Sequence, residues 1–112
     1  MPPAAYETFT DSNWEREVAG SPVPVLVHFY ADWCVPCRTV SRTLESLVGS
    51  YEGRLRLGRL DVDGNAAVAE RYKVQGLPTL MLLAGGQVRE RRVGLMADED
   101  LRRFVDAGAV SS

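Results

Sequence analysis

The feature that most restricts the fold of this chain is an apolar run that leads directly into two closely spaced cysteines. Residues 25–30, with the sequence VLVHFY, are almost all apolar, β-branched or aromatic, which is typical of a strand covered on both faces. Cys34 and Cys37 follow, and apolar residues then recur at helical spacing from Val40 to Val48. These patterns predict a central strand, a cysteine pair and a helix, in that order.

Local signals predict where the other helices begin and end. Ser12 followed by Glu15 is a capping-box pattern and predicts the start of a first helix. Gly49 is expected to end the helix behind the cysteines, because glycine is common just after a helix C-terminus. Asn65 is expected to cap a short third helix, and apolar spacing predicts a closing helix over residues 97–105.

The strand patterns complete the order of elements. Besides a weak first strand at residues 6–9 and the run at 25–30, strands are predicted at 55–62, 79–83 and 88–93. Gly85-Gly86 is a tight-turn dipeptide that joins the last two as a hairpin. The order β-α-β-α-β-α-β-β-α predicts an α/β fold with a central mixed sheet of about five strands, flanked by about four helices. We expect a single domain over residues 1–112.

Length and charge narrow the class of protein. A chain of 112 residues can bury a hydrophobic core, so a disulfide is not needed to hold the fold together. A formal net charge of −2 gives no electrostatic reason to expect nucleic acid or an anionic membrane as a partner. The first residues lack the basic and apolar regions of a secretion signal, and no segment approaches the ~20 apolar residues of a membrane span. We therefore expect a cytoplasmic protein, and a monomer.

The spacing of the two cysteines indicates a redox site. Cys34 is expected at or near the helix N-cap, where backbone N–H groups and the helix dipole favour the thiolate, the reactive form of the thiol. Pro36 in the first helical turn costs no hydrogen bond. We expect Cys34 to be the exposed sulfur and Cys37, one turn further along, to be the shielded one.

Two other interpretations of the pair are weaker. A closed zinc site needs four nitrogen or sulfur ligands, and the chain has two cysteines and one histidine, so no metal is expected. An inert structural disulfide that closes so short a loop would remove little entropy from the unfolded chain.

The motifs together resemble the thioredoxin family over residues 6–105. The resemblance is carried by the sequence WCVPCR at 33–38 behind an apolar strand, GLPT at 76–79 before a later strand, Val93-Gly94 before the last helix, and the order of elements. It implies a protein-disulfide reductase that acts by dithiol–disulfide exchange. Cys34 would attack a substrate disulfide, and Cys37 would resolve the mixed disulfide and leave a Cys34–Cys37 disulfide.

The resemblance also implies the surroundings and partners of the pair. Pro78 would be a cis-proline that faces the cysteines, and an apolar rim for the substrate would surround Cys34, made of Trp33, Val35, Leu77, Pro78 and Gly94. Disulfide-containing proteins would be the substrates. No bound cofactor is expected, because electrons would come from NADPH through a separate thioredoxin reductase.

Several positions depart from the family pattern. His28 stands where most thioredoxins have a buried aspartate that is thought to take the proton of the resolving cysteine. A neutral imidazole can also accept a proton, but His28 can equally be a core residue without a catalytic part. Arg59 replaces a lysine and is expected to keep His28 neutral, with Asp61 as a candidate charge partner. Arg42 replaces a proline, which makes a kink in the helix less likely.

Val35 also replaces a commoner glycine between the cysteines, and it can shield the sulfurs and change the redox potential.

Two further functions stay open for a chain of this kind. One is an oxidase or isomerase built on the same fold, which its reduction potential would identify. The other is a binding module or co-chaperone whose apolar rim recognises a partner irrespective of redox state.

Overall fold

The computed structural model describes residues 5–110 and has the predicted order of elements. Five strands alternate with helices and helical turns, and the hairpin comes before the last helix. The elements are β1 (Glu7–Phe9), η1 (Glu15–Ala19), β2 (Val25–Tyr30), α1 (Val35–Leu47), η2 (Val48–Tyr51), β3 (Arg56–Asp61), α2 (Ala66–Arg71), β4 (Thr79–Ala84), β5 (Gln87–Val93) and α3 (Asp98–Ala109).

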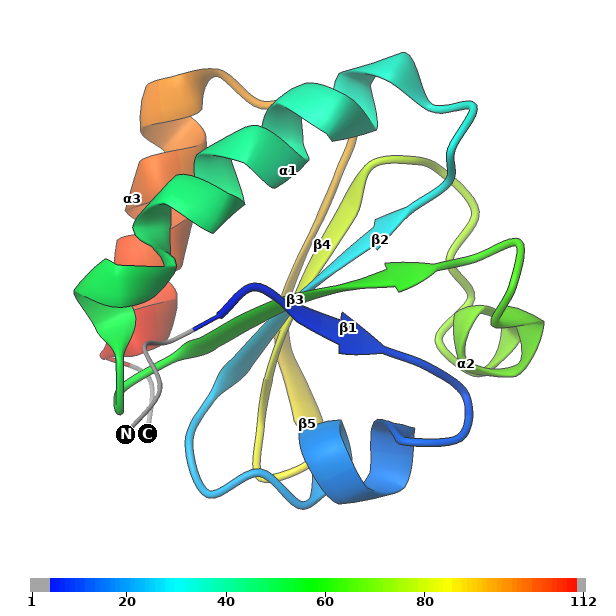
Figure 1. Ribbon diagram of the computed structural model, residues 1–112, viewed down its shortest axis with the longest axis horizontal. Coiled ribbons are helices and arrows are strands. Elements are labelled where there is room, and N and C mark those ends of the chain that lie inside the picture. The colour runs from blue at the N-terminus through cyan, green and yellow to red at the C-terminus, as the bar shows by residue number, and fades with distance from the viewer. Residues whose placement is uncertain (1–4, 111–112) are drawn as a thin grey trace.

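The strands form one mixed sheet in the order β1-β3-β2-β4-β5 (Figure 1). β1, β3 and β2 run parallel, whereas β4 is antiparallel to β2 and β5 is antiparallel to β4. β2 is the middle strand, and its first five residues are buried, so the prediction of a central strand covered on both faces is confirmed. Gly85 and Gly86 both have positive φ angles of 60° and 78°, as the tight hairpin turn between β4 and β5 requires.

Helices cover both faces of the sheet (Figure 1). On one face, α1 and α3 pack on alternate residues of the strands, such as Leu26 and Leu80. On the other face, η1 and α2 pack on the residues between them, such as Val27 and Met81. Each face therefore has its own apolar core. Because side chains alternate along a strand, His28 lies on the α1 face together with Leu26.

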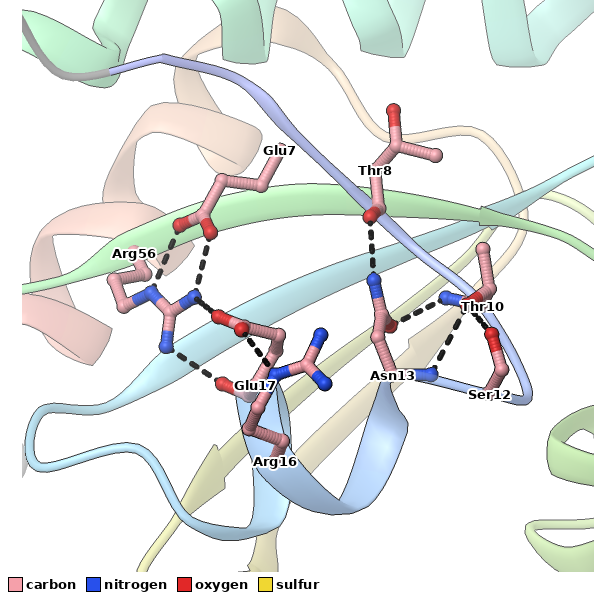
Figure 2. A network of polar contacts seen from close by, with 8 residues as sticks. All are labelled: Glu7, Thr8, Thr10, Ser12, Asn13, Arg16, Glu17 and Arg56. Atoms are coloured by element: carbon pink, nitrogen blue, oxygen red, sulfur yellow. Dashed lines mark hydrogen bonds and ion pairs between the residues drawn. The ribbon is translucent and has the colours of Figure 1, made fainter.

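The start of the first helix differs from the prediction. Ser12 and Glu15 do not form the capping box: the Ser12 hydroxyl contacts the Thr10 hydroxyl, and Glu15 pairs with an arginine of α2. The reciprocal pair lies two residues earlier (Figure 2), where the Thr10 N–H donates to Asn13 Oδ1 at 2.7 Å and the Asn13 N–H donates to Thr10 Oγ1 at 3.1 Å. Threonine and asparagine offer the same local hydrogen bonds as the predicted pair. The helix that follows is one π-helical turn.

The ends of the next two helices also differ in detail. Gly49 does not follow the helix directly, because α1 ends at Leu47 and the chain continues through the 3-10 turn η2, which contains Gly49. Asn65 is the N-cap of α2, but its side chain makes no bond to the helix. Asp11 caps α2 instead, and its carboxylate accepts the N–H groups of Ala67 and Val68 at 3.1 and 2.9 Å.

A half-buried ion cluster attaches the N-terminal strand β1 to the sheet (Figure 2). Arg56 of β3 donates to both carboxylate oxygens of Glu7 in β1, at 2.8 and 2.5 Å. It also donates to the carboxylate and the backbone carbonyl of Glu17 in η1, at 2.8 and 2.6 Å. Its guanidinium lies 5.9 Å from the centre of the Phe9 ring. A bidentate arginine–carboxylate pair has a fixed geometry, so Arg56 of β3 fixes the positions of β1 and η1 relative to its own strand.

The sheet ends at β5, whose seven residues are all exposed. Three of them are arginines, at positions 89, 91 and 92, and one is a glutamate. Arg91 donates to the carbonyl of Tyr72 at 2.5 Å, so one of the arginines fastens the strand to the turn behind α2. Over residues 5–110, no helix has the length and apolarity that crossing a membrane would require.

Candidate active site

The fold places the cysteine pair where the central strand meets a helix. Cys34 is the N-cap of α1, with an extended backbone (φ −87°, ψ 100°), and Val35 and Pro36 are the first two helical residues. Pro36 has no N–H, which would lack a partner in the first turn of the helix in any case. Cys34 and Cys37 form a disulfide with a Cα–Cα distance of 5.4 Å.

The exposure of the two cysteines differs from the expectation in one respect. Cys34 was expected to be exposed, but only 5% of it is accessible, against 2% for Cys37. The order of the two is the expected one, but both cysteines are buried. The neighbouring residues Trp33 and Val35 are exposed instead, at 68% and 67%. The chain therefore presents an apolar surface beside a covered disulfide.

The loop before β4 carries the predicted proline. The Leu77–Pro78 peptide bond is cis, and Pro78 is buried at the start of the strand. Its carbonyl accepts the N–H of Gly94 at 2.8 Å, so the structure joins these two residues of the predicted rim. Gly94 has a φ of +96°, a conformation that favours glycine. Leu77 is half-buried and packs on the core of the η1 and α2 face.

Asp63 holds the exposed tryptophan beside the cysteines and was not found from the sequence. The indole Nε1 of Trp33 donates to Asp63 Oδ2 at 2.9 Å. Asp63 lies two residues behind β3, which is the parallel neighbour of β2. The ends of neighbouring parallel strands meet at one edge of a sheet. That placement is the signal that would have pointed to Asp63.

His28 is completely buried and contacts two hydroxyl groups. Its Nδ1 lies 3.2 Å from the Tyr6 hydroxyl and 3.3 Å from the Ser41 hydroxyl, whereas its Nε2 has no hydrogen-bond partner among the described residues. Burial, and secondly the charge of Arg59, lower the pKa of His28 to about 4. Burial also raises the pKa of Tyr6. All members of this cluster are therefore uncharged at neutral pH.

The two hydroxyl residues were not predicted as parts of the site. Ser41 follows Cys37 by four residues in α1, so the two lie on the same face of the helix. That spacing was a usable signal. Tyr6 comes from the segment before β1, two strands away from β2, and only the order of strands brings it to His28.

Arg59 pairs directly with His28 in the register of β3 and β2. Its guanidinium lies 5.1 Å from the centre of the Tyr30 ring, a cation–π contact. Among residues 5–110, no carboxylate comes within ion-pair distance of it. The candidate partner Asp61 is not within ion-pair distance of Arg59, and its Oδ1 accepts the N–H of Asp63 at 3.0 Å.

A cleft of about 410 Å³ lies beside Cys37. Cys37, Ser41, Arg59 and Tyr30 are among the residues that line it. A larger hollow of about 690 Å³ lies between β5 and α3, and neither a cysteine nor the histidine lines it. Within the part of the chain that the structure describes, no three or more histidine, cysteine, aspartate or glutamate side chains are grouped so as to hold a metal ion. The groups at this site that can undergo redox chemistry are the two cysteine sulfurs.

Comparisons with known proteins agree with this geometry. Residues 5–107 match the family model described as Thioredoxin. The chain is 39% identical to the thioredoxin of Allochromatium vinosum over 98 residues, which are 88% of this chain and 92% of the relative. It is 37% identical to the thioredoxin of Pseudomonas aeruginosa over 98 residues, 88% of this chain and 91% of the relative. With thioredoxin 1 of a Nostoc species it shares 38% over 97 residues, 87% and 91% of the two chains.

Proposed function

We infer the function of this chain from the premise that it belongs to the thioredoxin family, a family of thiol-disulfide oxidoreductases. The chain is a protein-disulfide reductase. The observation that carries this conclusion is the disulfide between Cys34 and Cys37 at the N-terminus of α1. A disulfide that spans only two residues between its cysteines adds little stability. We therefore infer that the Cys34–Cys37 disulfide serves to be reduced and re-formed.

We propose separate roles for the two sulfurs. In the reduced protein, the Cys34 thiolate attacks a substrate disulfide, forms a mixed disulfide and expels one substrate sulfur as a thiolate. The Cys37 thiolate then attacks Cys34 Sγ, and the second substrate sulfur leaves. Two electrons pass from the protein dithiol to the substrate. The N-cap position of Cys34, beside the exposed side chains of Trp33 and Val35, supports this assignment.

We propose that the substrate segment binds across Trp33, Val35, Leu77, Pro78 and Gly94. Trp33 and Val35 offer exposed apolar area beside the disulfide. The hydrogen bond from the Gly94 N–H to the Pro78 carbonyl joins the two loops that carry the other residues of this surface. Exposed aromatic and aliphatic groups next to a reactive atom are typical of binding surfaces.

His28 is a candidate proton acceptor for the resolving step, although a weak one. A thiol has a pKa near ~8.5, and the pKa of His28 is lowered to about 4. Proton transfer between them is therefore uphill by about 6 kcal/mol at 1.36 kcal/mol per unit. We propose that His28 is neutral in every resting state and takes a proton only during the step itself. The variants His28→Ala and His28→Asp should both change the pH dependence of resolution, and unchanged profiles in both would contradict this role.

We propose that a separate thioredoxin reductase returns the disulfide to the dithiol with electrons from NADPH. The membership of the family supports a reductase partner of this kind. A reducing compartment such as the cytoplasm would suit this direction of electron flow. A reduction potential far above that of the cytosolic glutathione pool would instead favour an oxidase or isomerase.

The test is the reduction of insulin disulfides with dithiothreitol as the electron donor. We expect turnover by the wild type, none by Cys34→Ser or Cys37→Ser, and a trapped mixed disulfide with the latter, detected by mass spectrometry. Ser46→Ala changes an exposed serine of the same helix and should leave turnover unchanged. Full turnover by either cysteine variant would contradict the assigned roles.

A further inference from the structure

One hydroxyl group joins the buried histidine of β2 to the cleft beside Cys37. Two hydroxyls lie close to Nδ1 of His28, that of Tyr6 at 3.2 Å and that of Ser41 at 3.3 Å. The residues that line the cleft include Cys37 and Ser41 but neither His28 nor Tyr6. Ser41 is half-buried, whereas His28 is completely buried. Ser41 therefore contacts the imidazole from the wall of the cleft that also contains the resolving cysteine.

Helix α1 places Ser41 next to Cys37. The two residues are four positions apart in this helix, so their Cβ atoms lie about 5–6 Å apart on one face. One water molecule can bridge a thiol and a hydroxyl at such a spacing. A donor and an acceptor that are joined through one water meet the geometric requirement for acid–base catalysis. A proton thus has a short path from the thiol to the hydroxyl.

The hydrogen-bonding capacity of the two hydroxyls suits a lone pair on Nδ1. A buried tyrosine hydroxyl needs an acceptor for its hydrogen, and Nδ1 lies within hydrogen-bond distance of Tyr6. The hydroxyl of Ser41 can donate to the same lone pair, and its oxygen has lone pairs of its own. Ser41 can therefore accept a proton on the side of the cleft while it donates one to Nδ1.

The other neighbours of His28 offer no comparable path. Its partner in register on β3 is Arg59, a cation that has no acceptor. Its partner on β4 is the apolar Leu80. Tyr30 packs with its ring centre 6.0 Å from that of the imidazole, and its ring lies under the guanidinium of Arg59. Within residues 5–110, the second ring nitrogen, Nε2, has no hydrogen-bond partner.

We propose that the Ser41 hydroxyl relays the proton of the Cys37 thiol to Nδ1 of His28 during the resolving step. This inference rests on the proposed function, in which Cys37 resolves the mixed disulfide. The thiol proton passes through one water of the cleft to Ser41 Oγ, and the hydroxyl hydrogen of Ser41 passes to Nδ1. The Cys37 thiolate attacks Cys34 Sγ, and the substrate sulfur leaves with the electron pair of the broken bond. The imidazolium then returns its proton to the cleft along the same path.

The test follows the resolving step in a single turnover. Reduced protein is mixed with one equivalent of the aromatic disulfide dithiobis(nitrobenzoate), and stopped-flow absorbance records the two thionitrobenzoate anions. Attack by Cys34 releases the first anion, and attack by Cys37 releases the second. Ser41→Ala should slow the second release about tenfold at pH 6, less than the usual effect of a positioned acid or base, because water in the cleft takes over part of the transfer.

The pH profile distinguishes a relay from a structural role. Above the thiol pKa of about 8.5 the resolving thiol is already ionised, so the difference between Ser41→Ala and the wild type should vanish there. A merely structural defect would slow the second release at every pH. In a His28→Gln background, Ser41→Ala should have no further effect, because the two residues act in one path.

The chain offers matched control variants. Tyr6→Phe removes the other hydroxyl from Nδ1, which does not line the cleft, and should leave the second release nearly unchanged. Ser41→Thr keeps a hydroxyl and should retain the wild-type rate, whereas Ser41→Val, which has the same shape without a hydroxyl, should be as slow as Ser41→Ala. If Ser41→Ala does not fold, as judged by circular dichroism, the threonine and valine variants provide the comparison.

The form of the imidazole is a second readout. His28 is the only histidine, so nitrogen NMR of the isotopically labelled protein reports which ring nitrogen carries the hydrogen. We expect the hydrogen on Nε2 and the lone pair on Nδ1 at pH 7. A hydrogen on Nδ1, or a second release at pH 6 that is as fast in the folded variants without the hydroxyl as in the wild type, would overturn the proposal.

Insulin reduction separates this proposal from the function on which it rests. If insulin reduction fails in the wild type while the second release still depends on the Ser41 hydroxyl, the proposed function is wrong and the relay stands. If insulin reduction succeeds and the second release does not depend on that hydroxyl, the relay is wrong and the proposed function stands.

Discussion

Lowering the pH from 7.5 to 5.0 should destabilise this protein through a single residue. His28 is the only histidine of the chain, and the folded protein lowers its pKa from 6.5 to about 4. Below pH 6.5 the unfolded chain therefore takes up a proton that the folded protein still refuses. Stability that is fully present above pH 6.5 is lost progressively as the pH falls towards 4.

The magnitude follows from the two pKa values. Integration of the proton linkage from pH 7.5 to 5.0 gives a loss of about 2 kcal/mol in the free energy of unfolding. Glu17 and Asp98, the carboxylates whose pKa values the fold lowers, are mostly ionised down to pH 5.0 even in the unfolded chain, so they add little to this loss. A loss of this size is a substantial part of the ~5–15 kcal/mol that stabilises a typical protein.

The assay is urea denaturation followed by tryptophan fluorescence at several pH values, for the wild type and for His28→Gln. The variant cannot take up the proton, so its free energy of unfolding should be nearly constant from pH 7.5 to 5.0, whatever its value at pH 7.5. A wild type whose stability also stays constant, or a variant that loses the same 2 kcal/mol, would refute the assignment of a buried, neutral His28.

Further predictions concern stability and the rim. A methyl group added at Gly58 would overlap the Phe9 ring and lie 2.9 Å from a backbone carbonyl, whereas none of the described atoms lies within 4 Å of one added at Gly49. Gly58→Ala should therefore cost about 3 kcal/mol and Gly49→Ala almost nothing in urea denaturation, and equal effects would contradict the packing of this strand. Asp11→Ala removes the cap of α2 and should cost about 1 kcal/mol, with Asp11→Asn retaining part of it. Asp63→Leu frees the indole and should slow insulin reduction by raising KM, with unchanged stability; an unchanged KM would argue against a role for the tryptophan in binding.

The sequence predicted the parts of the fold that depend on short-range patterns. The apolar run at residues 25–30 predicted a strand covered on both faces, and β2 is the middle strand with such a cover. The spacing of proline and cysteine predicted that α1 begins behind Cys34, as it does. Periodicity and turn chemistry act within a few residues, and they were sufficient for these elements.

The sequence failed where the partner of a group lies far along the chain. Asn65 had the right residue type for the cap of α2, but Asp11, more than fifty residues away, makes the bonds to the helix. Asp61, two residues along the same strand, is the charge partner that the sequence suggests for Arg59, yet the cation lies over the ring of Tyr30 in the neighbouring strand. Several residues can satisfy a charge or an N–H group equally well, and only the path of the chain decides which one is near.

The arginine-rich edge strand has a consequence for the protein at the concentrations found in a cell. An uncovered strand offers its backbone groups to any other strand, including β5 of a second copy. Antiparallel pairing of two such copies would bring arginines of one copy next to arginines of the other, since three of the seven residues of β5 are arginines. Like charges opposite each other disfavour that pairing. The arginines of β5 therefore disfavour edge-to-edge pairing with β5 of a second copy even at high protein concentration.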